Sequence, residues 1–134
     1  APLDDLAVAL GLAAQELAQT EGREAMDTFL QQLARPGVES GLEAAEKLQK
    51  APVPELVGWQ QRWLYDMLSF KLSGRIRYYP RYRKELSALS GRAEVAGLLH
   101  ALKAVQERRA VADHPLAARL FIEDMLLEYS SLFA

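Results

Sequence analysis

Two histidines, His100 and His114, are the only imidazole groups in the chain and its first candidates for catalysis or metal binding. Neither belongs to a Glu-x-x-His or His-x-x-x-His pattern, the spacings that place two metal ligands on one helical face. We therefore expect no metal site. His100 is expected to be a structural residue of a helix, and His114, which precedes Pro115, is expected at a helix start.

Serine and carboxylate side chains could also support catalysis, but their spacing does not favour it. None of the seven serines lies in a nucleophile elbow, and the absence of cysteine excludes thiolate zinc sites and cysteine nucleophiles. The carboxylates Glu123, Asp124 and Glu128 are typical of a solvated helix face. No Gly-x-x-x-x-Gly-Lys or Gly-x-Gly-x-x-Gly pattern is present. We predict no catalytic residue, no cofactor and no small-molecule substrate for this chain.

The segment from Gly74 to Lys84 is the only concentrated basic patch, with five cations and three tyrosines in eleven residues. Guanidinium groups attract phosphates and aromatic rings stack on bases, so this mixture suits single-stranded or duplex nucleic acid. The alternative is a structural connection whose tyrosines pack on the fold and whose arginines pair with helical acids, and we favour this alternative. The candidate nucleic-acid contacts are Arg75, Arg77, Tyr78, Tyr79, Arg81, Tyr82 and Arg83.

Helical periodicity dominates the elements that must hold these residues. Apolar residues recur every three or four positions, and no useful stretch alternates apolar and polar residues as a strand would. Half of the residues are apolar and a quarter are charged, and 134 residues suffice for one hydrophobic core. We therefore predict a single all-α domain over residues 1–134, a compact bundle of about five longer helices and one or two short ones.

Glycine and proline set the expected helix boundaries. Thr20-Glu21-Gly22 should break a first helix at 3–19 from a second, which Arg35-Pro36-Gly37 should end. A short helix is expected at 42–49. The longest helix should begin at the prolines of 51–54 and end at Gly74, another should begin near Ser90-Gly91, and Leu86 with Leu89 should add one turn.

The last expected helix, 116–133, is apolar on two faces. A single stripe is enough to bury a helix against its own core. A helix with two stripes is either central in its own bundle or packs its second face against another chain, and periodicity alone leaves both open. The broad stripe contains Phe121, Ile122, Met125, Leu126, Tyr129, Leu132 and Phe133, and the second contains Leu116, Leu120 and Leu127.

Charge and hydropathy limit the partners and the location of the chain. A formal net charge of -2 gives no overall attraction to nucleic acid or to an anionic membrane, so any such binding must be local. No apolar run reaches the roughly 20 residues that a membrane span needs, and no basic region followed by an apolar block marks the amino terminus. We expect a cytoplasmic protein without a membrane partner.

Three segments in this order resemble a known family. They are similar to the C-terminal region of the delta-prime subunit of bacterial DNA polymerase III, and the similarity spans most of the chain. It is strongest from Trp59 onward, whereas residues 3–49 agree mainly in helical pattern. The segments are Trp63-Leu64-Tyr65-Asp66-Met67-Leu68, Gly74-Arg75-Ile76-Arg77-Tyr78-Tyr79-Pro80 and His114-Pro115-Leu116-Ala117-Ala118-Arg119-Leu120-Phe121-Ile122-Glu123-Asp124-Met125-Leu126-Leu127.

This resemblance implies the collar domain of a clamp loader. In that family two nucleotide-binding-type domains precede a helical third domain, and only the third corresponds to this chain. The helical domains of the delta, delta-prime and gamma or tau subunits pack side by side and hold the hetero-oligomer together, while ATP-dependent motions elsewhere load the sliding clamp for DNA replication. The resemblance thus implies that Leu116, Leu120 and Leu127 contact neighbouring subunits.

Overall fold

The structure, a computed structural model, describes residues 2–113 and 117–134, which form six α-helices and two short 3-10 helices. No strand occurs in these two ranges, so the predicted all-α class is confirmed. In chain order the elements are α1 (Pro2–Ala34), α2 (Val38–Leu48), α3 (Val53–Ser73), η1 (Pro80–Tyr82), α4 (Arg83–Arg92), α5 (Val95–Arg109), α6 (Ala118–Ser130) and η2 (Ser131–Phe133).

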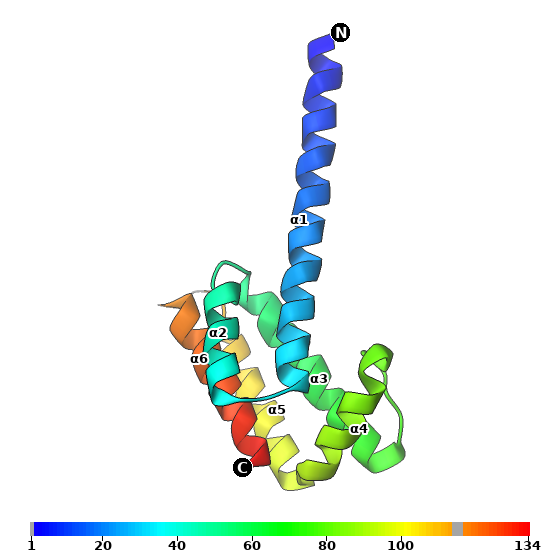
Figure 1. Cartoon of the computed structure of the whole chain (residues 1–134), viewed down its shortest axis with the longest axis vertical. Coiled ribbons are helices and arrows are strands. Elements are labelled where there is room, and N and C mark those ends of the chain that lie inside the picture. The colour runs from blue at the N-terminus through cyan, green and yellow to red at the C-terminus, as the bar shows by residue number, and fades with distance from the viewer. Residues whose placement is uncertain (1, 114–116) are drawn as a thin grey trace.

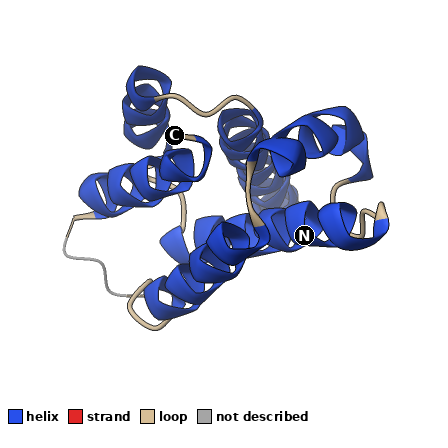
Figure 2. Cartoon of the chain, turned by 90° about the horizontal axis from the view of Figure 1, so that it is seen from below, coloured by secondary structure: helices blue, strands red, loops and turns tan. Residues whose placement is uncertain are grey.

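The helices form one bundle around α3 (Figure 1). Helix α3 packs against α5 and α4 and also contacts α1, while α2 packs against α6. Figure 2 shows the same helices from below, joined by loops. A single core therefore draws on all six helices, with α2 contributing Ala44, Ala45 and Leu48. Its largest fully buried side chains are Phe29 and Leu33 of α1, Leu56, Trp63, Leu64 and Met67 of α3, Leu86 of α4, Leu98 of α5, and Ile122, Met125 and Leu126 of α6.

Helix α1 is continuous for 33 residues, so the predicted break at Thr20-Glu21-Gly22 is wrong. An isolated glycine costs only about 1 kcal/mol in a helix interior, which the helix-forming residues around it outweigh. Thr20 is also helical, and its hydroxyl donates to the Glu16 carbonyl at 2.9 Å, a contact that threonine can make within a helix. The two segments predicted on either side of the break are therefore one element.

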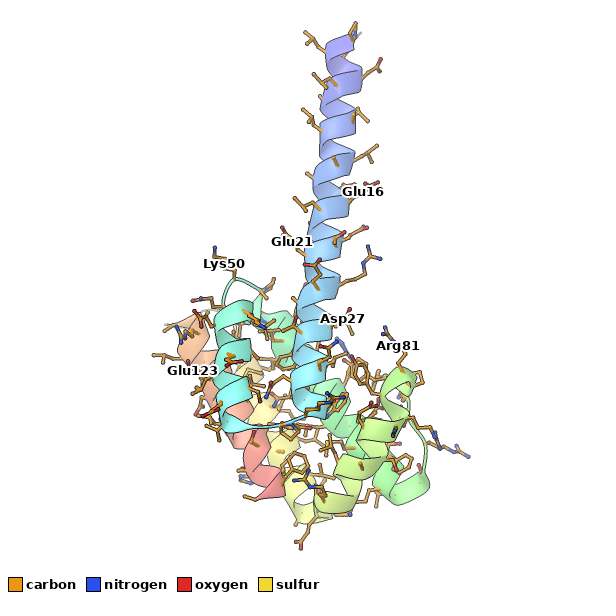
Figure 3. All side chains as sticks on the ribbon, in the orientation of Figure 1. Glu16, Glu21, Asp27, Lys50, Arg81 and Glu123 are labelled. Atoms are coloured by element: carbon orange, nitrogen blue, oxygen red, sulfur yellow. The ribbon has the colours of Figure 1, made fainter. Side chains whose placement is uncertain are left out.

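The N-terminal part of α1 projects from the bundle, as Figure 1 shows. In Figure 3 the side chains around Glu16 stand clear of the other helices, whereas those near Asp27 lie among them. Only residues near the C-terminal end of α1, such as Phe29 and Leu33, are buried. The large apolar side chains of the projecting part are exposed by 56–78%, and they are Leu3, Leu6, Val8, Leu10, Leu12 and Leu17.

Helix α3 has the boundaries that its proline and glycine residues predict. Pro52 is extended in front of the first turn, with φ -63° and ψ 115°, and Pro54 lies within that turn, where a backbone N–H is not required. At the other end Gly74 is left-handed, with φ 72°, and its N–H donates to the Phe70 carbonyl at 2.8 Å. The position of Gly74 fixes where the following loop starts.

The boundary between α4 and α5 differs from the prediction. Leu86 and Leu89, expected in a single turn, are both buried in a helix of 10 residues. Helix α5 begins at Val95 rather than near Ser90-Gly91, because Ser90 still belongs to α4 and the buried Ala93 is extended, with φ -109° and ψ 140°. Burial of Ala93 therefore sets this boundary.

The remaining helix ends are compared with their predicted positions in turn. Helix α2 begins at Val38 rather than at Leu42, directly after Gly37, whose extended backbone separates it from α1. The last helix ends in the 3-10 helix η2 near the predicted end at Phe133. The predicted start at His114-Pro115-Leu116 lies outside the described residues.

Candidate interaction surfaces

Helix α6 buries one of its two predicted apolar stripes and exposes the described part of the other. Ile122, Met125 and Tyr129 are buried in the core. Leu120 is 64% exposed and Leu127 is 41% exposed. Leu116, the third residue of that stripe, lies outside the described residues. The chain therefore leaves Leu120 and Leu127 on the outer face of α6.

A buried hydroxyl sets the position of α6 relative to α3 and α1. The indole Nε1 of Trp63 donates to the hydroxyl oxygen of Tyr129 at 2.9 Å, and that hydroxyl donates to the Leu33 carbonyl at 2.7 Å. Leu33 lies in the last turn of α1, where carbonyl groups have no partner within the helix. Desolvation raises the pKa of Tyr129, so the hydroxyl stays protonated and can donate.

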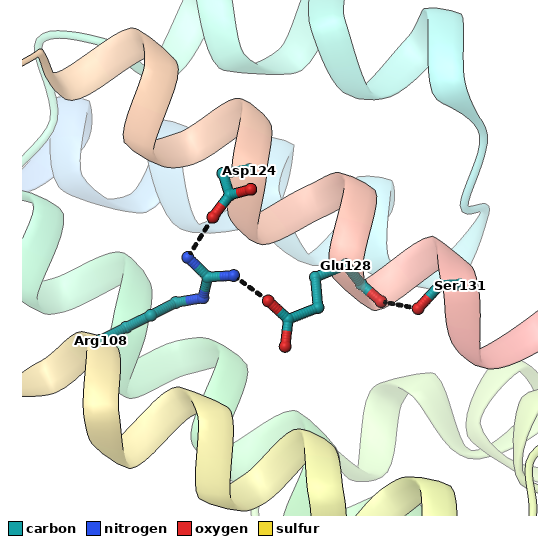
Figure 4. Close-up of polar contacts among 4 residues, drawn as sticks. All are labelled: Arg108, Asp124, Glu128 and Ser131. Atoms are coloured by element: carbon teal, nitrogen blue, oxygen red, sulfur yellow. Dashed lines mark hydrogen bonds and ion pairs between the residues drawn. The ribbon is translucent and has the colours of Figure 1, made fainter.

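The side chain of Arg108 joins α5 to α6, as Figure 4 shows. Its Nη1 lies 2.7 Å from Oδ2 of Asp124, and its Nη2 pairs with Glu128. The Arg108 side chain is only 14% exposed, and its guanidinium also lies 6.0 Å from the ring centre of Phe121. Two carboxylates on successive turns thus hold one cation, and this contact resists rotation of α6 about its own axis.

The carboxylate of Asp66 fixes the loop that follows α3. Asp66 is fully buried, and its carboxylate accepts hydrogen bonds from three consecutive backbone N–H groups. Its Oδ1 accepts from Arg77 at 2.9 Å, its Oδ2 accepts from Tyr79 at 2.8 Å, and the N–H of Tyr78 reaches both oxygens. Charge-assisted hydrogen bonds of this kind are among the stronger ones in proteins. The loop therefore has a defined shape, although it lacks regular secondary structure.

The three tyrosines of the basic segment lie in three different environments. Tyr79 is buried, and its hydroxyl donates to the Trp59 carbonyl at 3.3 Å, so its ring packs within the fold. Desolvation raises the pKa of Tyr79 to about 12. Tyr82 is half-buried, with its ring centre 5.4 Å from that of Trp63. Tyr78 is 39% exposed and remains accessible.

The arginines of the basic segment are exposed, and this holds for Arg75, Arg77, Arg81 and Arg83. Within the described residues, the cations of the ion pairs are Arg108 and Arg119, so the expected pairing of the loop arginines with helical acids is not seen. Arg83 is held by a hydrogen bond to the Gly74 carbonyl at 3.3 Å. The interpretation of this segment as a structural connection therefore fits Tyr79 and Tyr82, which pack on the fold, and does not fit the arginines.

Sequence reasoning missed the two residues that organise these surfaces, Asp66 and Tyr129. Asp66 follows Trp63 by three positions and so lies on the apolar face of α3, where an ionised side chain needs hydrogen-bond donors. That position was a usable signal for a buried carboxylate. The partner of the Tyr129 hydroxyl had no comparable signal, because Leu33 lies 96 residues away in the chain.

Metal-binding side chains do not cluster among the described residues. Among them, no group of three His, Cys, Asp or Glu side chains is placed to hold a metal ion. His100 is exposed on α5. None of the described helices is both long and apolar enough to cross a membrane. The features described above that could contact a partner are the outer face of α6 and the basic segment.

Comparison with known proteins identifies the family of the chain. No curated protein and no solved structure matches the chain. The family model described as DNA polymerase III, delta subunit, C terminal matches residues 21–131, from the part of α1 that approaches the bundle to the end of α6. Because this match spans most of the 134 residues, the chain belongs to this family of DNA polymerase III C-terminal domains and is the C-terminal domain of a clamp-loader subunit.

Proposed function

We propose that the chain is the collar domain of a clamp loader and that its parent protein is the delta-prime subunit. The family match, whose description names the delta subunit, supports a clamp-loader subunit. The resemblance of segments 63–68, 74–80 and 114–127 to the delta-prime subunit supports the finer proposal. Residues 1–134 would then act as one domain in the cytoplasm. The domain would hold its parent protein beside delta and gamma or tau subunits, while nucleotide-binding domains of the parent protein support ATP-dependent loading of the sliding clamp.

The outer face of α6 carries this proposal. Its opposite face is buried, and both the Tyr129 hydroxyl and the Arg108 ion pairs hold that orientation. Leu120 and Leu127 therefore have no route to burial within their own bundle. Packing them against a neighbouring subunit would remove apolar area from water, which is the main driving force of stable association.

The change Leu120→Asp with Leu127→Asp tests the collar role. In the full-length subunit, this double variant should lower the affinity for a complex of delta and gamma or tau by about 100-fold, because two apolar contacts become buried charges. Assembly would be measured by native mass spectrometry and analytical ultracentrifugation. Circular dichroism of the variant should remain that of the wild type, since both leucines are exposed.

Leu72→Asp provides the matched control, because Leu72 is 68% exposed and lies at the end of α3, away from α6. This variant should assemble as the wild type does. Normal assembly of the α6 double variant would remove α6 from the interface. Loss of helical signal in the double variant would instead identify the two leucines as part of the core.

A second candidate function, contact with nucleic acid, is favoured by the loop of residues 75–79. Asp66 holds the backbone of residues 77–79 in one shape, so Arg77 extends from a fixed base, and Arg75 is exposed two residues before it. Tyr78 adds an exposed ring beside them. Fixed cations next to an accessible aromatic side chain suit a phosphate backbone with unstacked bases.

Titration of labelled single-stranded and primed DNA into the full chain at two salt concentrations tests this second function. Binding should weaken steeply as salt rises, because phosphate contacts release counterions. The variant with Arg75→Gln and Arg77→Gln should bind about tenfold more weakly at about 0.1 M salt. Binding that ignores salt, or that this variant retains in full, would exclude the loop as the DNA contact.

A further inference from the structure

A hollow of about 340 Å³ lies beside the 75–79 loop, where three elements meet. One face of α3 forms part of its wall, because positions 58, 61, 62 and 65 recur at helical spacing. The loop contributes Tyr78, and the end of α5 contributes Arg109. The lining residues are Gly58, Gln61, Arg62, Tyr65, Tyr78 and Arg109.

The hollow is lined by two guanidinium groups and by no carboxylate. Nη1 of Arg109 donates to Oε1 of Gln61 at 2.9 Å, a contact that positions the cation without neutralising it. A β-carbon at Gly58 would lie 3.4 Å from Nη2 of Arg62, so that guanidinium lies close to the α3 backbone at Gly58. Neither arginine belongs to an ion pair within the described residues. Both charges therefore remain available to an anion.

Aromatic rings border the same hollow. The ring centres of Tyr65 and Tyr78 are 5.6 Å apart in an edge-to-face arrangement, and the two residues are 42% and 39% exposed. The Arg77 guanidinium lies 5.4 Å from the centre of the Tyr78 ring, so a third cation stands beside a ring that lines the hollow. The result is one surface of cations and accessible rings drawn from α3, α5 and the loop.

Carboxylates lie close to the opposite end of the basic segment, near Tyr82. Burial is the largest cause that raises the pKa of Tyr82, and the negative charges of Asp27 and Glu85 raise this pKa further. These carboxylates offset the field of Arg81 close to Tyr82. The lining of the hollow, in contrast, contains no carboxylate.

We propose that this hollow binds a phosphate group of a single nucleic-acid strand, with Arg62 and Arg109 as its cations and Tyr65 and Tyr78 as stacking surfaces for a neighbouring base. The proposal rests on the second proposed function and extends it from the loop to α3 and α5. The rings favour nucleic acid over an acidic peptide, because carboxylates would use the guanidinium groups but not the exposed aromatic faces.

Fluorescence anisotropy of a labelled oligothymidylate of about 20 nucleotides, titrated with the full chain at about 50 and 200 mM salt, tests the hollow. The variant Arg62→Gln with Arg109→Gln should lose about tenfold in affinity, and its salt dependence should become shallower by about one phosphate contact or more. The variant Lys47→Gln with Lys50→Gln makes the same change in net charge at the α2 end of the molecule and should bind as the wild type does. Circular dichroism verifies that each variant is folded.

The variants separate failure of the hollow from failure of the loop. Full binding by the Arg62 and Arg109 variant, with weaker binding by the Arg75 and Arg77 variant, would overturn the hollow and leave the loop function intact. Full binding by both variants would overturn both the hollow and the loop as DNA contacts. An equal loss in the control with Lys47 and Lys50 replaced, or equal competition by an oligoglutamate peptide of the same charge, would also overturn the phosphate site.

Discussion

Replacement of Asp66 by alanine is expected to lower the free energy of unfolding by about 3–5 kcal/mol, because one buried and two part-buried backbone N–H groups lose their acceptor. The loop at 77–79 should lose its defined shape while the helices of the bundle remain. Urea unfolding measures the stability. Hydrogen exchange of the amides of residues 77–79 measures the loop, and these amides should change from protected to fast-exchanging.

Two further variants make this prediction specific. Asp66→Asn keeps the shape of the side chain but turns an N–H₂ group toward a donating backbone N–H, so it should also be destabilising. Asp5→Ala removes an exposed aspartate from α1 and should change the stability by less than about 0.5 kcal/mol. Full stability of the Asn variant, or unchanged exchange at 77–79 in the Ala variant, would contradict the role assigned to the carboxylate.

Replacement of Tyr129 by phenylalanine is expected to cost about 2–4 kcal/mol, since the Trp63 indole N–H and the Leu33 carbonyl both lose a buried partner. The ring itself is kept, so the loss reports on the hydroxyl. Urea unfolding monitored by tryptophan fluorescence measures the change. Tyr129→Leu would remove the ring as well and should be more damaging.

The pH dependence of this effect provides an internal control. Burial raises the pKa of Tyr129, so its stabilising contribution is fully present below its ordinary value of about 10 and is lost as the pH rises above that value. The stability difference between wild type and Tyr129→Phe should therefore be constant from neutral pH to about pH 9 and shrink above about pH 10. A difference that stays constant at high pH, or that is near zero throughout, would contradict the hydrogen-bonded role.

Local signals explain where the fold could be predicted from the sequence. Both ends of α3 follow from residues with restricted or permissive backbones, Pro54 and Gly74, whose effect requires no distant partner. The predicted break in α1 was wrong because Gly22 carries only a modest local penalty. The start of α5 depends on the burial of Ala93, which only the assembled core determines.

The candidate sites likewise divide into features that local sequence predicts and features that only the packed structure determines. Periodicity identified the second stripe of α6, and composition identified the basic segment. Neither could distinguish exposed Tyr78 from buried Tyr79, because a loop has no period that assigns its side chains to a face. The hollow escaped prediction for another reason: Arg62 and Arg109 lie 47 positions apart in the sequence and meet the loop only through the packing of α5 on α3.

The contacts of Asp66 are made to the main chain and to no side chain of the loop. Residues 77 and 78 can therefore be exchanged for others without disturbing the hydrogen bonds that shape the backbone, provided that they retain an N–H. Selection on the fold and selection on the charge of the surface then act on different atoms. Relatives that keep an aspartate at position 66 could diverge freely in the side chains displayed there, and an engineer could retune the same surface one residue at a time.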